Sequence, residues 1–208
     1  MNLHAVIILF ASLLLSVTPA HSQQPDKSAR DNRICWQEGV RLQWSDFRAP
    51  RCYGCTYSTF VAAATSANVL VVGFTTNDNK QDYRVTCRFL RDSSWVNPVA
   101  AQHDASYRAS TLAHEQLHFD IYELIARKIR QYAAQHRAAG DDLFGPVAAQ
   151  DIKCLLSELK ALNALYDDDV NFRTPTVEAA AQRRWTLRVA RELRALAPYR
   201  STATTCPD

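Results

Sequence analysis

The spacing of apolar residues changes near Asp104, and this change constrains the fold more than any other feature of the chain. Before it, apolar and polar residues alternate, as they do in half-buried strands. After it, apolar residues recur at intervals of three and four, as they do on the buried face of a helix. Strands followed by helices predict an α+β domain.

The N-terminal half contains four segments that predict strands. Three are rich in Val, Thr, Phe and Tyr and a shorter one precedes them; they cover residues 39–44, 57–64, 69–76 and 83–90. The polar run at 77–80 predicts a hairpin turn between the last two segments. An antiparallel sheet is therefore expected in this half.

The C-terminal half predicts three helices. The first spans residues 104–138 and stops before Gly140, a residue type that favours the end of a helix. A second helix begins at Pro146 and ends at the acidic run 167–169, and a third begins near Pro175. We expect the sheet to pack on the first helix.

The first 22 residues carry no charged side chain and contain an apolar run of the length found in secretory signal peptides. We interpret residues 1–22 as a signal peptide and expect the protein in the periplasm or outside a bacterial cell. Residues 23–33 predict a flexible segment, residues 34–198 one domain and residues 199–208 a tail. No segment after the signal peptide is long and apolar enough to predict a membrane span.

Six cysteines agree with export, because disulfides form in oxidising compartments. We favour a bridge from Cys154 to Cys206 and two bridges within the N-terminal half, among Cys35, Cys52, Cys55 and Cys87. The C-x-x-C pair that starts at Cys52 also fits a redox or a zinc-binding motif. It precedes a strand-like run and has no second C-x-x-C pair, so a structural disulfide is favoured.

The first predicted helix carries the motif H-E-x-x-H, formed by His114, Glu115 and His118. Residues four apart lie on one helical face, so both imidazoles reach one metal ion. Glu115 lies about 100° further around the helix, where its carboxylate reaches a water on the metal. The motif predicts a zinc site with Glu115 as the general base. The alternative is a buried helix with two hydrogen-bonded core histidines.

Apolar residues share the face of the two histidines, and charged residues lie opposite. Ile121, Ile125 and Ile129 follow the histidines at helical spacing, which points both imidazoles into the protein. The opposite face predicts a solvated surface with an ion pair between Glu123 and Arg127. The members of that face are Asp120, Glu123, Arg127 and Arg130.

The formal net charge of +3 indicates no particular partner. Arginines are frequent on the third helix and in the tail, and their scattered positions predict a solvated face rather than a nucleic-acid surface. They are Arg183, Arg184, Arg188, Arg191, Arg194 and Arg200. We therefore expect a protein or peptide substrate and no nucleic-acid partner.

Longer strings around the motif resemble a family of bacterial proteins described as predicted secreted zinc-dependent proteases, whose function is otherwise unknown. The strings are LAHEQLHFDI at 112–121, LQWSDF at 42–47, Ser94-Trp95-Val96, Tyr166-Asp167 and Gln182-Arg183-Arg184-Trp185. They span nearly all of the chain after the signal peptide. The resemblance implies a zinc-peptidase-like fold, in which the sheet packs on a zincin-like active-site helix.

The chain departs from this family at one place. After the Tyr-Asp pair the family commonly carries a Thr and then His-Gly, whereas this chain has Phe172 and Arg173 at the positions where His and Gly are expected. If that His is a ligand in relatives, this protein uses another group or binds metal weakly.

A catalytic zinc needs a third protein ligand. Asp167 ends the second predicted helix and matches the family's Tyr-Asp pair, so it is the preferred ligand, followed by Asp169 and Glu158. Glu123 lies opposite His114 on the same helix and does not reach the ion. His103 is expected to be a loop histidine, with a substrate contact or a fourth ligand as the alternative.

These features predict an exported zinc-dependent peptidase in which His114, His118 and Asp167 hold Zn²⁺. One alternative is an inactive zinc-binding envelope protein that binds a partner through its sheet edge, as the absence of the family's His indicates. Another is zinc-dependent hydrolysis of a non-peptide bond, such as a cell-wall amide. We expect Trp44, Trp95 and Trp185 to be core residues.

Overall fold

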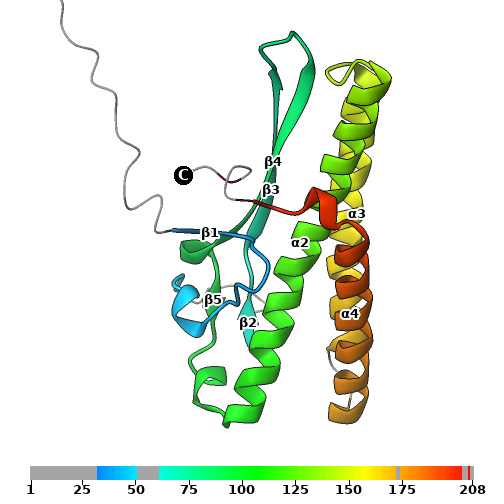
Figure 1. Ribbon diagram of the computed structural model, residues 1–208. Coiled ribbons are helices and arrows are strands. Elements are labelled where there is room, and N and C mark those ends of the chain that lie inside the picture. The colour runs from blue at the N-terminus through cyan, green and yellow to red at the C-terminus, as the bar shows by residue number, and fades with distance from the viewer. Residues whose placement is uncertain (1–31, 51–60, 172–173, 203–205, 207–208) are drawn as a thin grey trace, which may run out of the picture.

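In the computed structural model, a sheet lies on one side of a long central helix and two helices lie on the other (Figure 1). Strands precede helices along the chain, so the predicted α+β class and N-terminal antiparallel sheet are confirmed. The predicted signal peptide, the Cys52 pair and Phe172 lie outside the described residues. The structure describes residues 32–50, 61–171, 174–202 and 206.

The main sheet has three antiparallel strands in the order β1-β4-β3. β3 (Ala67–Thr75) and β4 (Gln81–Leu90) form a long hairpin, and β1 (Arg33–Cys35) pairs with the other edge of β4. The turn at 77–80 contains Asn79 at a φ of 61°, a left-handed conformation that Asn tolerates. The hairpin turn predicted there is therefore confirmed.

Two short strands form a second sheet, β2 (Ala63–Ala64) and β5 (Trp95–Val96). The strand predicted at 39–44 was wrong, because these residues form an irregular segment that leads into a 3-10 turn, η1 (Trp44–Asp46). In that turn the Asp46 carboxylate accepts the backbone N–H of Gln43 at 2.8 Å. This local hydrogen bond favours a turn over strand pairing.

The central helix is α2 (Ala105–Ala139), which carries the H-E-x-x-H motif. It begins where the Asp104 carboxylate accepts the backbone N–H of Tyr107 at 3.0 Å. It ends at Gly140, which has a φ of 78°. Glycine adopts this left-handed conformation without the steric penalty that other residues have. The helix predicted at 104–138 is therefore confirmed to within a residue.

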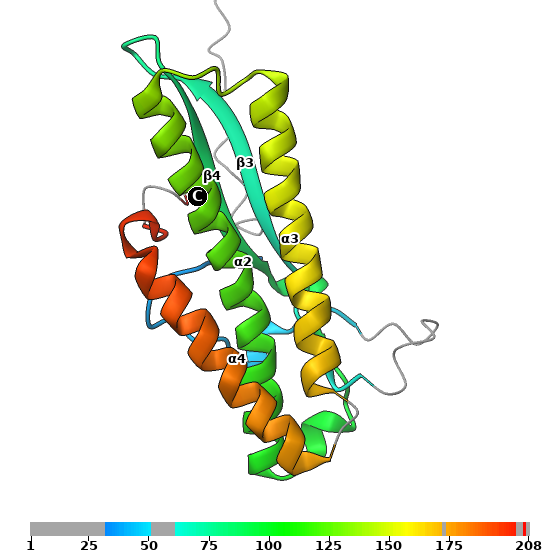
Figure 2. The ribbon, with the colours of Figure 1, turned by 90° about the vertical axis from the view of Figure 1, so that its right-hand side faces the viewer.

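Two further helices pack against α2, namely α3 (Pro146–Val170) and α4 (Pro175–Ala195). Both begin with a proline in the first turn, as predicted. Figure 2 shows α3 and α4 flanking α2, with the hairpin of β3 and β4 behind it. The middle of α2, residues 114–134, has no exposed residue, whereas both ends of the helix are exposed.

The charged stripe of α2 is buried, and its prediction as a solvated face was wrong. Glu123 is 0% exposed and Arg127 is 3% exposed. Arg127 donates to Glu123 at 2.9 Å, as the predicted ion pair requires, and Arg130 donates to the same carboxylate at 3.2 Å. The chain after α4 covers this stripe, since Ser201 bonds Glu123 through both its N–H (2.9 Å) and its hydroxyl (2.6 Å).

The disulfide joins Cys35 of β1 to Cys206, so the predicted bridge from Cys154 to Cys206 was wrong. After α4 the chain returns to the sheet beside β1 (Figure 1), whereas Cys154 is exposed on α3 with a free thiol. Cys87 is buried with a free thiol, so it forms none of the bridges predicted for the N-terminal half. Burial also raises the pKa of the Cys87 thiol.

The core lies between the sheet and α2 and continues between α2 and the other two helices. Trp185 is buried in it, as predicted, whereas Trp44 and Trp95 are half-buried. Among the residues that the structure describes, no helix has the length and apolar character needed to cross a membrane.

Candidate metal site

Three side chains from two helices meet at one point. His114 and His118 lie four residues apart on α2, and Asp167 lies in the last turn of α3. The Nε2 atoms of the two histidines are 3.0 Å apart, and Asp167 Oδ1 is 3.2 Å from the first and 3.1 Å from the second. In the described part of the chain this is the one group of His, Cys, Asp and Glu side chains arranged to hold a metal ion.

The spacing of the three atoms fits a zinc ion. Around a tetrahedral zinc with bonds of about 2.0–2.1 Å, two ligand atoms lie about 3.3 Å apart. The observed separations of 3.0–3.2 Å are close to that value. A single proton bridges only two of three such atoms, whereas a cation satisfies all three. Two imidazoles and one carboxylate also match the ligand sets of catalytic zinc sites.

Solvent reaches the site from the side of Asp167. The side chains of His114 and His118 are 18% and 13% exposed, whereas that of Asp167 is 45% exposed. A catalytic zinc keeps one position open for water or substrate. The exposed side of Asp167 provides room for such a position.

The site favours positive charge. Burial by itself lowers the pKa of His118, but the hydrogen bond to Asp167 and the charges of Glu115 and Asp167 outweigh it and raise that pKa above its usual value. Burial by itself raises the pKa of Asp167, but hydrogen bonds from both histidines hold it well below its usual range. Both directions mean that a positive charge, here the proton on His118, is stabilised beside the negatively charged Asp167.

Glu115 is the buried acid beside the site. It is 3% exposed, and its Oε2 has no hydrogen-bond partner among the described residues. Its charge contributes to the raised pKa values of His118 and Tyr166. A buried carboxylate oxygen without a partner is costly unless a bound group uses it.

Several residues around the ligands were not predicted as part of the site. Asn163 Oδ1 lies 2.7 Å from His118 Nδ1, and the Tyr166 ring stacks on His114 with centroids 4.7 Å apart. Asn171 donates to Asp167 Oδ1 at 3.1 Å. The spacing along α3 contained a signal for Asn163, because it lies one turn before Asp167 and therefore on the same face.

The helix α4 contacts the residues of α3 near Asp167. Tyr166 donates its hydroxyl hydrogen bond to Gln182, and Trp185 donates to Asp169 at 2.8 Å. The Tyr166 and Trp185 rings are 5.5 Å apart. The Tyr-Asp and Gln-x-x-Trp strings of the sequence therefore contact each other.

The other predicted candidates lie elsewhere. Asp169 accepts from Trp185, and Glu158 accepts from Lys128 at 2.5 Å. The His103 ring lies against the Tyr107 ring, with centroids 4.4 Å apart. Glu123 bonds the arginines of the buried stripe, on the far side of α2 from the histidines.

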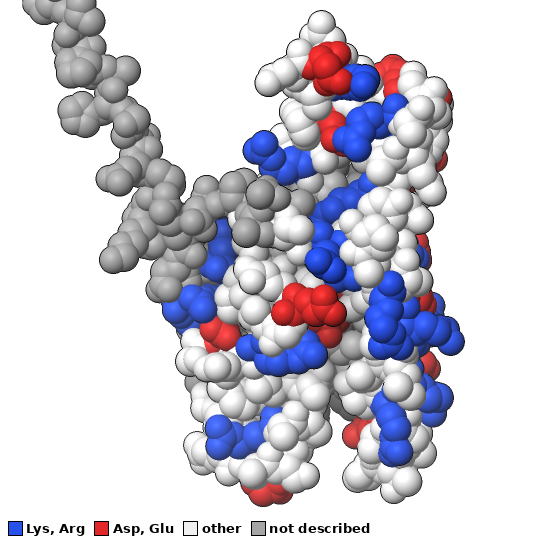
Figure 3. All heavy atoms as spheres, in the orientation of Figure 1, with Lys and Arg blue, Asp and Glu red and all other residues white. Residues whose placement is uncertain are grey.

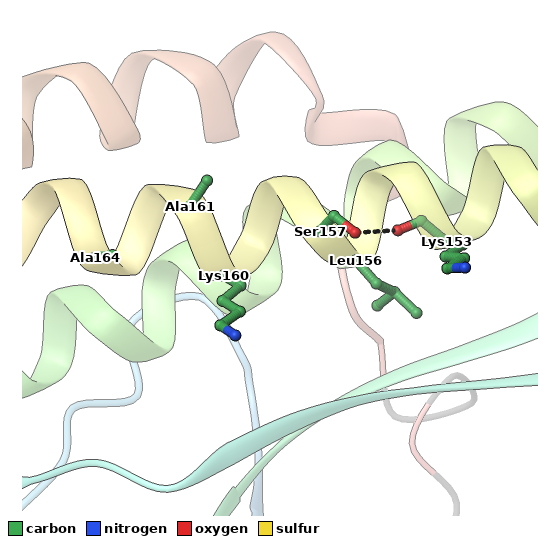
Figure 4. Close-up of a pocket in the computed structure, with 6 residues that line it drawn as sticks. All are labelled: Lys153, Leu156, Ser157, Lys160, Ala161 and Ala164. Atoms are coloured by element: carbon green, nitrogen blue, oxygen red, sulfur yellow. Dashed lines mark hydrogen bonds between the residues drawn. The ribbon is translucent and has the colours of Figure 1, made fainter.

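Two surface features contain none of the candidate ligands. A hollow of about 460 Å³ follows one face of α3, where Leu156 and Lys160 point to the same side (Figure 4). Its lining contains no candidate ligand: Lys153, Leu156, Ser157, Lys160, Ala161 and Ala164. Basic side chains gather over α4 (Figure 3), where Arg183, Arg184, Arg188, Arg191 and Arg194 are exposed.

None of the known family models, curated proteins or solved structures matches this chain. The site is therefore interpreted from its own geometry.

Proposed function

We propose that this protein is an exported zinc-dependent peptidase. The observation that carries the proposal is the meeting of His114 Nε2, His118 Nε2 and Asp167 Oδ1 within 3.2 Å of one another, beside a buried carboxylate without a partner. Two histidines and one carboxylate match the ligands of a metal-dependent hydrolase, and the second carboxylate, that of Glu115, matches its general base. The Cys35–Cys206 disulfide agrees with a location in the periplasm or outside the cell.

Each side chain has a separate role in this proposal. His114, His118 and Asp167 would hold the zinc, which supplies an activated water and polarises the scissile carbonyl. Glu115 takes a proton from the attacking water and passes it to the leaving amine. Its Oε2 has no hydrogen-bond partner among the described residues, so this atom is available to accept that proton.

The direct test combines metal analysis with peptide cleavage. Purified protein is expected to contain one zinc per chain and to cleave a denatured protein substrate. Glu115→Ala is expected to keep the zinc and lose about 100-fold or more of the cleavage rate, since general acid–base catalysis contributes roughly that much. The matched control is Asp168→Ala, an exposed acid next to Asp167. Cleavage at the wild-type rate by Glu115→Ala would contradict the mechanism.

A second candidate function is a zinc-binding protein without catalysis that binds a partner by strand addition. One observation favours it: β3 is one of the two edge strands of the main sheet, is nine residues long, and exposes Leu70 (45%) and Val72 (47%). A long apolar edge offers a pairing surface for an extended peptide. Full zinc occupancy without hydrolysis across a peptide library, with partner binding lost in the double variant Leu70→Lys/Val72→Lys, would favour this function.

A further inference from the structure

The side chain of Asn163 has a fixed orientation next to His118. Its Nδ2 donates to the backbone carbonyl of Leu159 at 2.9 Å, and its Oδ1 lies 2.7 Å from His118 Nδ1. The reversed amide would put Oδ1 against the Leu159 carbonyl, and two acceptors at that distance repel each other. The amide oxygen therefore faces the imidazole, and an amide oxygen only accepts hydrogen bonds.

This orientation decides where the His118 ring carries its proton. Because Asn163 Oδ1 accepts, His118 Nδ1 must donate and carry the hydrogen. Nε2 faces His114 and the Asp167 carboxylate, and it donates to that carboxylate when the ring is charged. In the neutral ring that donates to Asn163, the lone pair is on Nε2. The other tautomer would point an N–H into the space between the three ligand atoms and block a cation.

We infer that Asn163 is a positioning residue, which holds His118 in the tautomer that presents Nε2 to the metal. The inference rests on the proposed zinc site but not on catalysis. It also gives α3 two functions at one site, because Asp167 is a ligand one turn after the residue that orients a ligand of α2. A shift of α3 along α2 would disturb both.

The wild-type protein tests the tautomer without any substitution. Nitrogen-15 NMR of labelled histidine, in metal-free protein at alkaline pH where the ring is neutral, is expected to show His118 with its hydrogen on Nδ1. After zinc is added, Nε2 is expected to shift as the coordinating nitrogen. A hydrogen on Nε2 in the metal-free protein, or coordination through Nδ1, would overturn the inference.

Variants at Asn163 test the consequence for metal affinity. Asn163→Leu removes the acceptor and is expected to weaken Co²⁺ and Zn²⁺ binding by about 10–100-fold, as losses of outer-shell partners do. Asn163→Asp keeps an acceptor for Nδ1 but loses the donor to Leu159, so it is expected to recover part of the affinity lost in Asn163→Leu. A purely structural role of the amide would not produce that partial recovery. Ser157→Ala is the matched control, because Ser157 is exposed on the same helix, and it is expected to leave metal affinity unchanged.

The outcomes separate the inference from the proposed function. If wild-type protein binds neither metal at the three ligands, the proposed zinc site fails, while the NMR spectrum still decides the tautomer. If wild-type protein binds and Asn163→Leu binds equally well, the positioning role fails and the zinc site stands.

Discussion

Asp167 and Asp168 are neighbours on α3, but it is Asp167 that faces the two histidines. Asp167→Ala removes one of the three proposed ligands, so zinc affinity is expected to fall by more than about 100-fold, beyond the loss typical of an outer-shell partner. Competition with a chelator of known affinity measures the change. Asp168→Ala is expected to leave affinity unchanged, and far-UV circular dichroism should be unaffected in both variants. Equal zinc affinity in both variants would show that Asp167 is not a zinc ligand.

The sequence was most informative about residues that lie close together along the chain. The spacing of His114 and His118 alone places both on one helical face, and the structure agrees. Asp167 was preferred because it ends a helix and matches a family string, and the structure brings it to the histidines. Tyr166 and Asn163 were not predicted as neighbours of the histidines, because the register between two packed helices depends on the whole interface.

The helix α2 contains two arginine–glutamate interactions that differ from a similar pair on α4 mainly in burial. The Glu123–Arg127 pair is buried, whereas Arg188 and Glu192, also four residues apart, have side chains 43% and 28% exposed. Glu123→Ala leaves the buried Arg127 charge without its partner, which costs about 3–5 kcal/mol. Glu192→Ala is expected to cost less than about 1 kcal/mol, as exposed pairs do.

Urea unfolding of both variants measures this difference. A much lower midpoint for Glu123→Ala than for Glu192→Ala is expected. Similar midpoints would mean that the Ser201 contact and the two arginines contribute little to the stability of the folded chain.

The elements themselves were largely predictable, and the errors have a common cause. Helix α2 was predicted to within a residue because its cap residues and its period are local signals. The same period separated an apolar from a charged stripe but did not show that the charged stripe would be covered. That covering depends on Ser201 and its neighbours, which lie far away along the chain. The strand predicted at 39–44 does not form, because Asp46 accepts a local hydrogen bond from Gln43. The alternation of apolar and polar residues does not reveal that bond.

At the scale of the whole molecule, the Cys35–Cys206 disulfide joins the first strand to the tail that covers α2. Removing it with Cys206→Ser is expected to lower the free energy of unfolding by about 2–5 kcal/mol, because the unfolded chain gains entropy when a long loop opens. Thermal unfolding under non-reducing conditions measures the loss. Cys154→Ser is the control, since Cys154 is exposed with a free thiol, and it is expected to unfold at the wild-type temperature. An unchanged unfolding temperature for Cys206→Ser would show that the disulfide does not contribute to the stability of the folded chain.

The same disulfide closes a covalent ring, because it joins two cysteines with a sequence separation of 171. The helices α2, α3 and α4, the hairpin and all three proposed ligands lie inside this ring. A single cut anywhere between the two cysteines leaves the polypeptide as one covalent molecule. A chain nicked once by a protease would therefore stay together, as one band on a non-reducing gel and two on a reducing gel.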